Sequence, residues 1–506
     1  MSTQLTVTIL ENEFWWGGSV HHGYQMPIGK DSEVSVDPGA SDSCDQSAPV
    51  YVSSRGRYLW SDRPFTLRAA KGELRLEGMG GIQLEEGYGN LKGAYLAAAR
   101  HFPFSDRLPD KRFFSQPQYN TWIELGTEQT SRGILRYARG ILRHGLPAGI
   151  LMIDEGWAED YGVFEFNRRK IPNPKALMDS LHEMGFSVML WVTPNIACAG
   201  PRFQELREKG YLVLDCEGNP AIRNWWNGYS AVLDLTNPEA FVWFCTQLDS
   251  LMSRYGVDGY KFDAGDSYFY RDDDRIFTTM PALEHTRMYN SLGERYALNE
   301  FRAAWNYGGH PIVSRLQDKF HSWDHFGIDT LVPHTILQGL TGYAYCCPDM
   351  VGGGSIGSFG EGHLLDQELF VRWAQASACM GMMQMSIAPW RVLSPKYSTL
   401  VQDAMKLHEQ LGKQIWDLAR HAAQSGEPIV RHMAYEFPDE GLEQVNDQFM
   451  LGSDLLLAPV LEPHASVRRV RLPQGRWKDW KGHILEGGRT IEALVDLRDI
   501  PRYIKA

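Results

Sequence analysis

Two patterns of hydrophobic and polar residues divide this chain. Residues 1–105 contain short segments such as QLTVTIL and GELRLEG, in which apolar and polar residues alternate between turns rich in Gly, Pro and Asp. Alternation with a period of two is typical of half-buried β-strands. We therefore predict a β-rich N-terminal domain over residues 1–105.

Between residues 106 and 395, short apolar segments alternate with amphipathic helical ones, such as RGILRYARGILRHG and NPKALMDSLHEMG. The predicted strands are residues 118–125, 148–154, 187–193, 257–263, 311–317, 342–347 and 383–389. This alternation indicates βα units around a parallel sheet, and seven or eight such units in roughly 280 residues match a (β/α)8 TIM barrel. A doubly wound open sheet is the alternative, but no glycine-rich phosphate-binding loop follows the first strands.

Residues 396–506 change pattern again. A long helical segment from Tyr397 to Gly426 is followed by strand-like segments such as QFMLGSDLLLAPVLE and VRRVRLPQGRWKDW, with turns between them. We predict a helical connection and a small C-terminal β-domain. An α/β chain of 506 residues thus divides into domains at residues 1–105, 106–395 and 396–506.

Composition narrows the classes of partner. The net charge is −12, from 50 basic and 62 acidic residues, which argues against a nucleic acid or an anionic membrane as partner because both require a basic surface. Aromatic residues make up 12% of the chain, and Trp and Tyr rings suit the faces of sugars. The sequence leaves open whether the chain forms a homo-oligomer.

The cysteines and the N-terminus bear on location. The seven cysteines are scattered and none has zinc-ligand spacing, so we expect reduced thiols, no metal and no cofactor. The first residues, MSTQLTVTIL, lack the basic and apolar regions of a signal peptide, and no apolar stretch is long enough to cross a bilayer. A cytoplasmic location is the resulting expectation.

Acidic residues close four of the predicted barrel strands. Asp154 and Glu155 follow the second strand, Asp263 the fourth, Asp318 the fifth and Asp349 the sixth. Barrel enzymes carry their chemistry at these carboxyl ends of the strands. Several acids that converge there are costly because they repel one another, so their presence indicates that a reaction uses them. A catalytic carboxylate cluster is therefore predicted.

Several of these residues also have a structural interpretation. Asp154 would cap the following helix, and Asp349 would organise the glycine-rich loop MVGGGSIGSFGEG that follows it. Trp191, at the end of the third strand, is a packing residue as readily as a platform for a sugar.

Two carboxylates on separate strands suit acetal hydrolysis, in which one attacks the anomeric carbon and the other protonates the leaving oxygen. Lys261 and Asp263 are two residues apart on a strand and share a face, so the ammonium would keep Asp263 ionised as nucleophile. Asp318 would be the acid, desolvated by Phe320 and Trp323. Arg302 and Arg315 would bind sugar hydroxyls or form ordinary ion pairs; these two arginines remain open between the two roles.

The motifs resemble glycoside hydrolase family 31. GILMIDEGW, DLTNPEAF, GVDGYKFDAGD, PDMVGG, MQMSIAPWR, GEPIVR and QFMLGSDLLLAPVLEP occur in that family's order from about residue 115 to 485. The resemblance implies a retaining, exo-acting α-glycosidase with an N-terminal β-sandwich, a catalytic barrel and a C-terminal β-domain. The segments KFDAG, PDMVGG and SIAPWR further imply activity on α-galactosides.

Carried over to this sequence, the resemblance implies that Asp263 is the nucleophile and Asp318 the general acid/base. Residues at sugar-binding positions of the family are Asp154, Trp191, Lys261, Arg302 and Arg315, with Trp157 and Trp390 lining the same pocket. Asp349, in the loop beside that pocket, is predicted as a further substrate-binding residue. No cofactor is implied, and the expected partner is a small-molecule α-glycoside.

Departures from the family pattern leave alternatives. Lys261 is foreign to the α-glucosidase members, and the residues around Asp318 differ from the usual ones, so Asp324 is a rival acid. Residues 14–25 are a candidate for a loop that the N-terminal domain lends to the site. The alternatives in function are an α-glucosidase or α-xylosidase, a barrel enzyme with a divalent cation on Asp154, Asp263 and Asp349, and a non-catalytic sugar-binding protein.

Overall fold

The computed structural model describes residues 3–39, 45–102, 105, 107–360 and 364–506. The N-terminal domain consists of two facing antiparallel sheets with a shared apolar core, as the alternating pattern predicts. The first sheet runs in the order β1 (Thr3–Thr8), β7 (Glu73–Gly78), β6 (Phe65–Ala70), β3 (Val34–Val36). The second contains β4 (Gln46–Ser53), β5 (Tyr58–Trp60) and β8 (Gln83–Glu85), with β2 (Trp15–Ser19) also paired to β4.

The N-terminal domain is joined to the barrel by backbone pairing. The short strand β17 (Ala304–Trp305), which belongs to the barrel region of the sequence, pairs in parallel with the first residues of β4. Two helices, α1 (Leu91–Ala98) and α2 (Arg112–Ser115), lead from this domain to the first barrel strand. The two regions therefore share one sheet and do not meet only through side chains.

The predicted (β/α)8 barrel is confirmed, with eight parallel strands in a nearly closed sheet. Along the sheet the strands are β19 (Cys346–Cys347), β18 (Val313–Arg315), β16 (Leu298–Phe301), β15 (Gly259–Phe262), β11 (Ser187–Val192), β10 (Ile150–Ile153), β9 (Gln118–Asn120) and β20 (Gln384–Met385). Their side chains are buried, because helices cover the outside and side chains fill the inside.

Local sequence signals begin and end the surrounding helices. Asn237 caps α7 (Pro238–Tyr255) by accepting from Glu239 N, Pro238 occupies the first turn, and Gly256 ends the helix with φ 82°. The other barrel helices are α3 (Trp122–Leu125), α4 (Ser131–Arg143), α5 (Pro174–Glu183), α6 (Pro201–Glu208), α8 (Ala282–Ser291), α9 (Leu331–Leu340), α10 (Gln367–Ser377) and α11 (Pro389–Val392).

Two strand predictions are corrected by the structure. The segment 118–125 is a strand only as far as Asn120, whose side-chain Oδ1 accepts from Trp122 N at 2.8 Å and starts the turn into α3. Strand β16 was not predicted, because two of its four residues are polar: Asn299 and Glu300, both fully buried. Polar residues inside the barrel hide the apolar signal by which buried strands are recognised.

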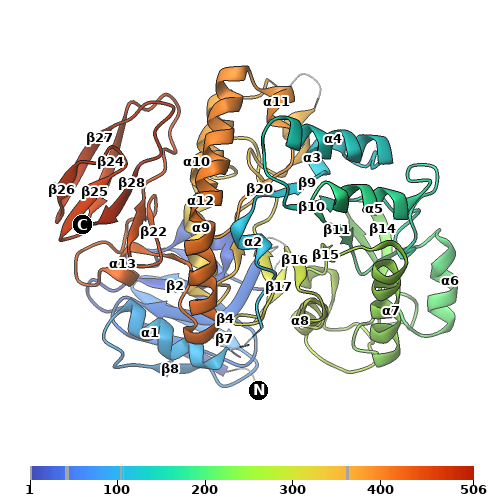
Figure 1. The fold of residues 1–506 in the computed structure, drawn as a ribbon. Coiled ribbons are helices and arrows are strands. Elements are labelled where there is room, and N and C mark those ends of the chain that lie inside the picture. Colours follow the sequence, from blue (N-terminus) through green and yellow to red (C-terminus); the bar gives the residue numbers. More distant parts are fainter. Residues whose placement is uncertain (1–2, 40–44, 103–104, 106, 361–363) are drawn as a thin grey trace.

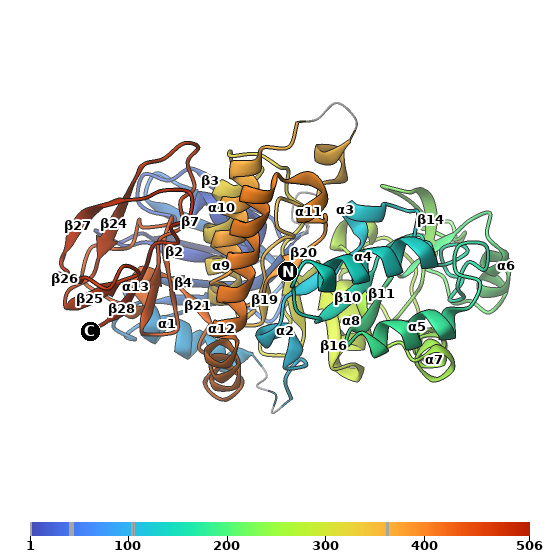
Figure 2. The ribbon, with the colours of Figure 1, turned by 45° about the horizontal axis from the view of Figure 1, so that its top comes forward.

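The C-terminal region begins with the long helix α12 (Pro395–Ser425) and continues through α13 (Met433–Glu436) into two antiparallel sheets. The larger sheet runs in the order β21 (Val430–Arg431), β22 (Phe449–Leu451), β23 (Leu455–Leu457), β28 (Arg502–Lys505), β25 (Arg476–Asp479), β26 (Ile484–Glu486), and β24 (Val467–Leu472) pairs with β27 (Arg489–Leu494). Figures 1 and 2 show α12 standing between this red β-domain and the green half of the barrel.

A small three-stranded sheet is inserted after β11. It consists of β12 (Asn195–Ala197), β14 (Gly228–Val232) and β13 (Ile222–Trp225). Within the described part of the chain, no helix is both long enough and apolar enough to span a bilayer. Six of the seven cysteines lie in that part and all six are free thiols, while Cys44 lies outside it.

Candidate active site

Asp263 directly follows β15 at the carboxyl end of the barrel. Its Oδ2 accepts a hydrogen bond of 2.9 Å from Trp191 Nε1, and its Oδ1 accepts one of 2.9 Å from Arg302 Nε. Burial by itself raises the pKa of this carboxyl, but the charges of Arg302, Lys261 and Arg315 hold it well below its ordinary value. Asp263 is therefore ionised at neutral pH, as a nucleophile must be.

The chain turns sharply after Asp263. Ala264, with φ 55°, and Gly265, with φ 73°, both adopt the left-handed region, which is costly for alanine. The turn lets Ala264 N donate to Asp263 Oδ1 at 2.8 Å. It also brings Asp266 to Arg302, whose Nη1 and Nη2 donate to its two carboxylate oxygens at 2.8 and 2.6 Å. Asp266 thus supports Asp263, the predicted nucleophile, by holding Arg302.

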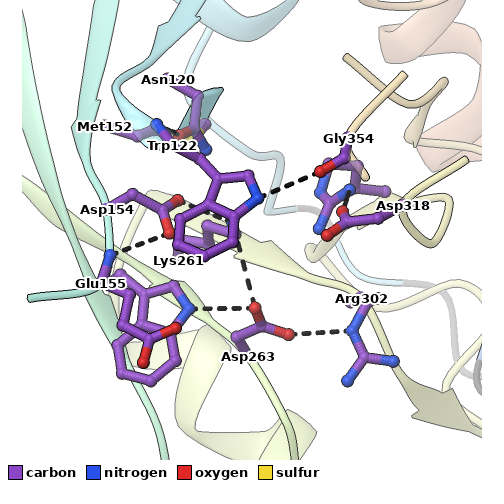
Figure 3. Close-up of polar contacts among 12 residues, drawn as sticks. Asn120, Trp122, Met152, Asp154, Glu155, Lys261, Asp263, Arg302, Asp318 and Gly354 are labelled. Carbon is purple, nitrogen blue, oxygen red and sulfur yellow. Dashed lines mark hydrogen bonds and ion pairs between the residues drawn. The ribbon is translucent and has the colours of Figure 1, made fainter. Parts of the chain in front are cut away.

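Lys261 and Asp154 form a buried ion pair beside Asp263. Lys261 Nζ lies 2.8 Å from Asp154 Oδ2 and 3.9 Å from Asp263 Oδ2, so Lys261 and Asp263 do share a face of β15. Phe262 points the other way, where its ring stacks on Phe301 at 4.6 Å. Figure 3 shows Asp154, Lys261 and Asp263 in one continuous set of contacts, with Arg302 on the far side of Asp263.

Asp318 follows β18 and is held by Arg315, whose Nη1 donates to its Oδ1 at 2.8 Å. The Asp318 side chain is 40% exposed, whereas that of Arg315 is 1% exposed. Its Oδ1 lies so close to Gly354 that a Cβ added there would be 2.6 Å away, so a side chain at this position would displace the Asp318 carboxylate. Asp318 is thus an accessible carboxyl on a rigid, buried arginine.

Asp263 and Asp318 act on the same ammonium group. Burial lowers the pKa of Lys261, but Asp154, and to a smaller extent Asp263 and Asp318, raise it above its ordinary value. The charges of the two predicted catalytic carboxyls are therefore both felt by one side chain. Figure 3 shows Asp263 in direct contact with Lys261 and Asp318 on the other side of the cluster.

Asp349 does not reach the sugar pocket that the sequence predicts for it. It is fully buried, and its oxygens accept from the backbone N–H groups of Lys319, Met350 and Gly354 at 2.6–2.7 Å. Arg315 Nη1 lies 3.1 Å from the same carboxylate. The structural interpretation holds for this residue: Asp349 organises the glycine-rich loop and orients Arg315.

The surroundings of Asp318 also differ from expectation. Phe320 is 52% exposed, and Trp323 Nε1 donates 2.8 Å to Asp366 Oδ2, so neither ring desolvates Asp318 as predicted. The rival acid Asp324 accepts from Ser322 Oγ at 2.7 Å and from Phe326 N at 3.0 Å, which makes it the organiser of its own turn. This geometry favours Asp318 over Asp324.

The three predicted tryptophans lie in different places. Trp191 contacts Asp263. Trp157 is 2% exposed and donates from Nε1 to the Trp191 carbonyl oxygen at 2.7 Å, so it fixes the backbone of Trp191. Trp390 is not brought to the site: its ring stacks at 4.8 Å on His144, which directly follows the outer helix α4. Its segment begins α11, which directs the indole outward to fill the space above Gly140.

Two residues at the site, Trp122 and Trp226, were not predicted from the sequence, and a third, Glu155, was predicted only as a member of the acidic cluster. Trp122 Nε1 donates 3.0 Å to Gly354 O and covers the cluster in Figure 3, but the predicted strand ran past it. Trp226, 48% exposed in the hairpin β13–β14, lies 5.5 Å from the Arg302 guanidinium. Glu155 accepts from Tyr161 Oη and Asn227 Nδ2, and burial raises its pKa. Glu155 was noted only as one of the acids at the strand ends, where its position was the available signal.

The N-terminal segment 14–25 does approach the site, through one residue. The His21 Nδ1 and Gln317 Nε2 atoms are 2.7 Å apart, and Gln317 precedes Asp318. Asp45, the residue before β4, accepts from Gln317 N at 2.6 Å. The N-terminal domain thus braces the loop that carries the acid.

The carboxylates do not form a metal site. Among the described residues no group of three or more His, Cys, Asp and Glu side chains is arranged to hold an ion. At Asp154 and Asp263, the place that a cation would take is filled by the Lys261 ammonium. The metal-assisted alternative is therefore disfavoured, because the positive charge of Lys261 would repel a divalent cation.

Comparison with family models and known sequences agrees with this arrangement. Residues 117–416 match the model described as "Glycosyl hydrolases family 31 TIM-barrel domain", and residues 426–506 match "Glycosyl hydrolase family 31 C-terminal domain". The chain is 33% identical over 410 residues to the myogenesis-regulating glycosidase of Mus musculus, an alignment covering 78% of this chain and 56% of that protein.

Two further similar proteins share less sequence with this chain. Alpha-glucosidase 2 of Bacillus thermoamyloliquefaciens is 25% identical over 411 residues, which is 74% of this chain and 51% of that protein. The chain thus spans about half the length of the curated relatives it matches. A solved family 31 dextranase from Flavobacterium johnsoniae, complexed with glucose, has the same fold, with a TM-score of 0.86 at 20% identity over 100% of this chain and 66% of that one.

Proposed function

This chain belongs to glycoside hydrolase family 31, and on that premise we propose that it is a retaining, exo-acting glycosidase of terminal α-galactosides. The observation that carries the proposal is the state of Asp263. It is ionised, fixed by Trp191 and Arg302, and placed at the same barrel rim as Asp318, whose carboxyl is exposed and whose charge also acts on Lys261. A carboxylate held this rigidly needs no reorganisation before attack.

In the proposed mechanism Asp263 attacks the anomeric carbon and forms a covalent glycosyl ester while the glycosidic C–O bond breaks. Asp318 donates its proton to the departing oxygen, then takes a proton from the water that hydrolyses the ester, which returns both carboxyls to their starting states. Asp154, Lys261 and Trp191 form the polar floor on which the sugar hydroxyls are oriented.

The α-galactoside preference is supported by the sequence around the nucleophile. KFDAGD carries Lys261, which is foreign to the α-glucosidase members, and in the structure this ammonium lies between Asp154 and Asp263. A fixed cation and anion at the end of the pocket offer a donor and an acceptor to a sugar hydroxyl of defined orientation. An axial 4-hydroxyl is the feature by which galactose differs from glucose there.

An α-glucoside or α-xyloside is the second candidate, with the same mechanism. Its support is that one relative is named an alpha-glucosidase and the dextranase was solved with glucose. A panel of aryl α-glycosides decides between the sugars: the galactoside should be turned over fastest. A kcat/KM for the glucoside or xyloside well above that for the galactoside would overturn the preference.

Mechanism and catalytic competence are tested separately. Asp263→Asn should lower turnover by about 10⁴-fold while monosaccharide binding persists, and undiminished turnover would refute the assignment of Asp263 as nucleophile.

The general acid is tested by a second variant. Asp318→Ala should slow the hydrolysis of substrates with poor leaving groups, whereas Asp324→Ala, the matched control, should not. The first sugar product, followed by NMR, should be the α-anomer; a β-anomer would refute retention. A wild-type chain that binds sugar but hydrolyses none of the panel would favour the non-catalytic alternative.

A further inference from the structure

Gln46 is a fully buried residue at the junction between the N-terminal domain and the barrel. It is the first residue of β4 and pairs with Ala304 in the neighbouring strand β17. Its Nε2 donates to the backbone carbonyl oxygens of both Arg302 and Arg315, the latter at 2.8 Å. Its Oε1 accepts from Gln338 Nε2 at 2.8 Å. The carboxamide is thus fully used, and its orientation is fixed.

The backbone carbonyls of Arg302 and Arg315 lie just past the point where the pairing of β16 and β18 ends. The register between β16 and β18 ends with the pair Phe301 and Ser314, so the next residues, Arg302 and Arg315, lie just beyond the ladder. There the Gln46 amide supplies the donors that a neighbouring strand would supply within a sheet. Gln338 adds to this anchor by donating to Ser314 O at 2.9 Å.

These two backbone positions carry the catalytic machinery. Arg302 holds Asp263 through Nε at 2.9 Å, and Arg315 holds Asp318 through Nη1 at 2.8 Å. Both arginine side chains are at most 9% exposed, so packing transmits a backbone shift to the guanidinium and on to the carboxylate. One amide from another domain therefore bears on both catalytic carboxyls.

We propose that Gln46 is a positioning residue for the reaction, because its carboxamide fixes the spacing of the β16 and β18 ends and so the separation of Asp263 from Asp318. The inference rests on the proposed function. Retaining hydrolysis needs the two carboxyls about 5–5.5 Å apart. A misplacement of about 1 Å can cost about 10²-fold in rate.

The test compares Gln46→Met with Gln375→Met, using an aryl α-glycoside that the wild type hydrolyses. Methionine keeps the length of glutamine but has no amide. Gln375 is also buried and also joins two domains, since it accepts from Arg372 Nη1 at 2.9 Å and donates to Leu497 O at 2.7 Å, far along the chain from the site. The control thus removes an equivalent structural amide without touching the catalytic arginines.

Gln46→Met should lower kcat by about 10–100-fold with KM changed less than kcat, and its thermal midpoint should fall about as far as that of Gln375→Met. The control should keep the wild-type kcat. A wild-type kcat in Gln46→Met, or an equal loss of kcat in both variants, would overturn the inference.

Should Gln46→Met fail to fold, Gln338→Met provides the second variant, because it releases the anchor of the Gln46 carboxamide. A fall in its kcat supports the proposal and an unchanged kcat overturns it. If the wild type hydrolyses no α-glycoside, the proposed function itself fails. If the wild type is active and Gln46→Met is equally active, only the inference about Gln46 fails.

Discussion

Variants of the buried ion pair between Lys261 and Asp154 should distinguish its contribution to folding stability from its contribution to catalysis. Their charged atoms are 2.8 Å apart, and the side chains are 4% and 3% exposed. Lys261→Met leaves Asp154 buried without its counter-ion, and removing one partner of such a pair costs about 3–5 kcal/mol of unfolding free energy. Asp154→Asn leaves the ammonium in the same position, although Asp263, 3.9 Å away, compensates part of its charge.

The double variant Lys261→Met/Asp154→Asn removes both charges together. Because neither charge is then left uncompensated, it should be less destabilised than the sum of the single variants, with a coupling of about 2–3 kcal/mol. Turnover should not recover. The preorganised ammonium beside Asp263 is still missing, and losing such a contact costs about 10²–10³-fold.

Urea unfolding followed by tryptophan fluorescence measures the stabilities, and the aryl glycoside assay measures turnover. Additive destabilisation in the double variant would show that the two side chains are not energetically coupled and would refute the buried ion pair. Recovery of turnover together with stability would instead refute the catalytic part of the reasoning, because Lys261 would then matter only for folding.

Three further predictions follow from the site. Arg302→Leu should move the acid limb of kcat/KM to higher pH: Arg302 lowers the pKa of Asp263, so without it the ionised nucleophile is lost at a higher pH as the solution is acidified. An unmoved limb would contradict this. Trp191→Phe, which removes the N–H that binds Asp263, should lower kcat by about 10-fold or more, whereas Trp390→Ala should lower the thermal midpoint and leave kcat and KM unchanged; equal kinetic losses would place Trp390 in the pocket after all. Exhaustive chelation should leave turnover unchanged, since Lys261 fills the place of a cation, and a loss restored by magnesium would revive the metal-assisted alternative.

The arrangement of the acids could be predicted from the sequence because it depends on two local periodicities. Strand segments alternate with helices, so their carboxyl ends meet on one rim, and Asp154, Asp263 and Asp318 had to lie there. The two-residue period of a strand put Lys261 and Asp263 on one face and Phe262 on the other. Both inferences use spacing alone, and the structure agrees with each.

Contacts between distant segments could not be obtained this way. The family resemblance predicted that Trp390 lines the sugar pocket and that Asp349 binds the substrate. In the structure the direction of α11 turns Trp390 towards α4 and His144, and the Asp349 carboxylate accepts hydrogen bonds from three backbone amides.

What the sequence by itself determined is the order of strands and helices and the residues at their ends, because backbone periodicity is local. What only the tertiary structure decided is which of those residues have side chains exposed at the site and which are held in hydrogen bonds with distant segments. Gln46 and Arg315 are 269 positions apart, and no local pattern records their hydrogen bond. The buried polar strand β16 could not be recognised for the same reason, since Glu300 meets Arg315 and Gln384 only once the barrel has formed.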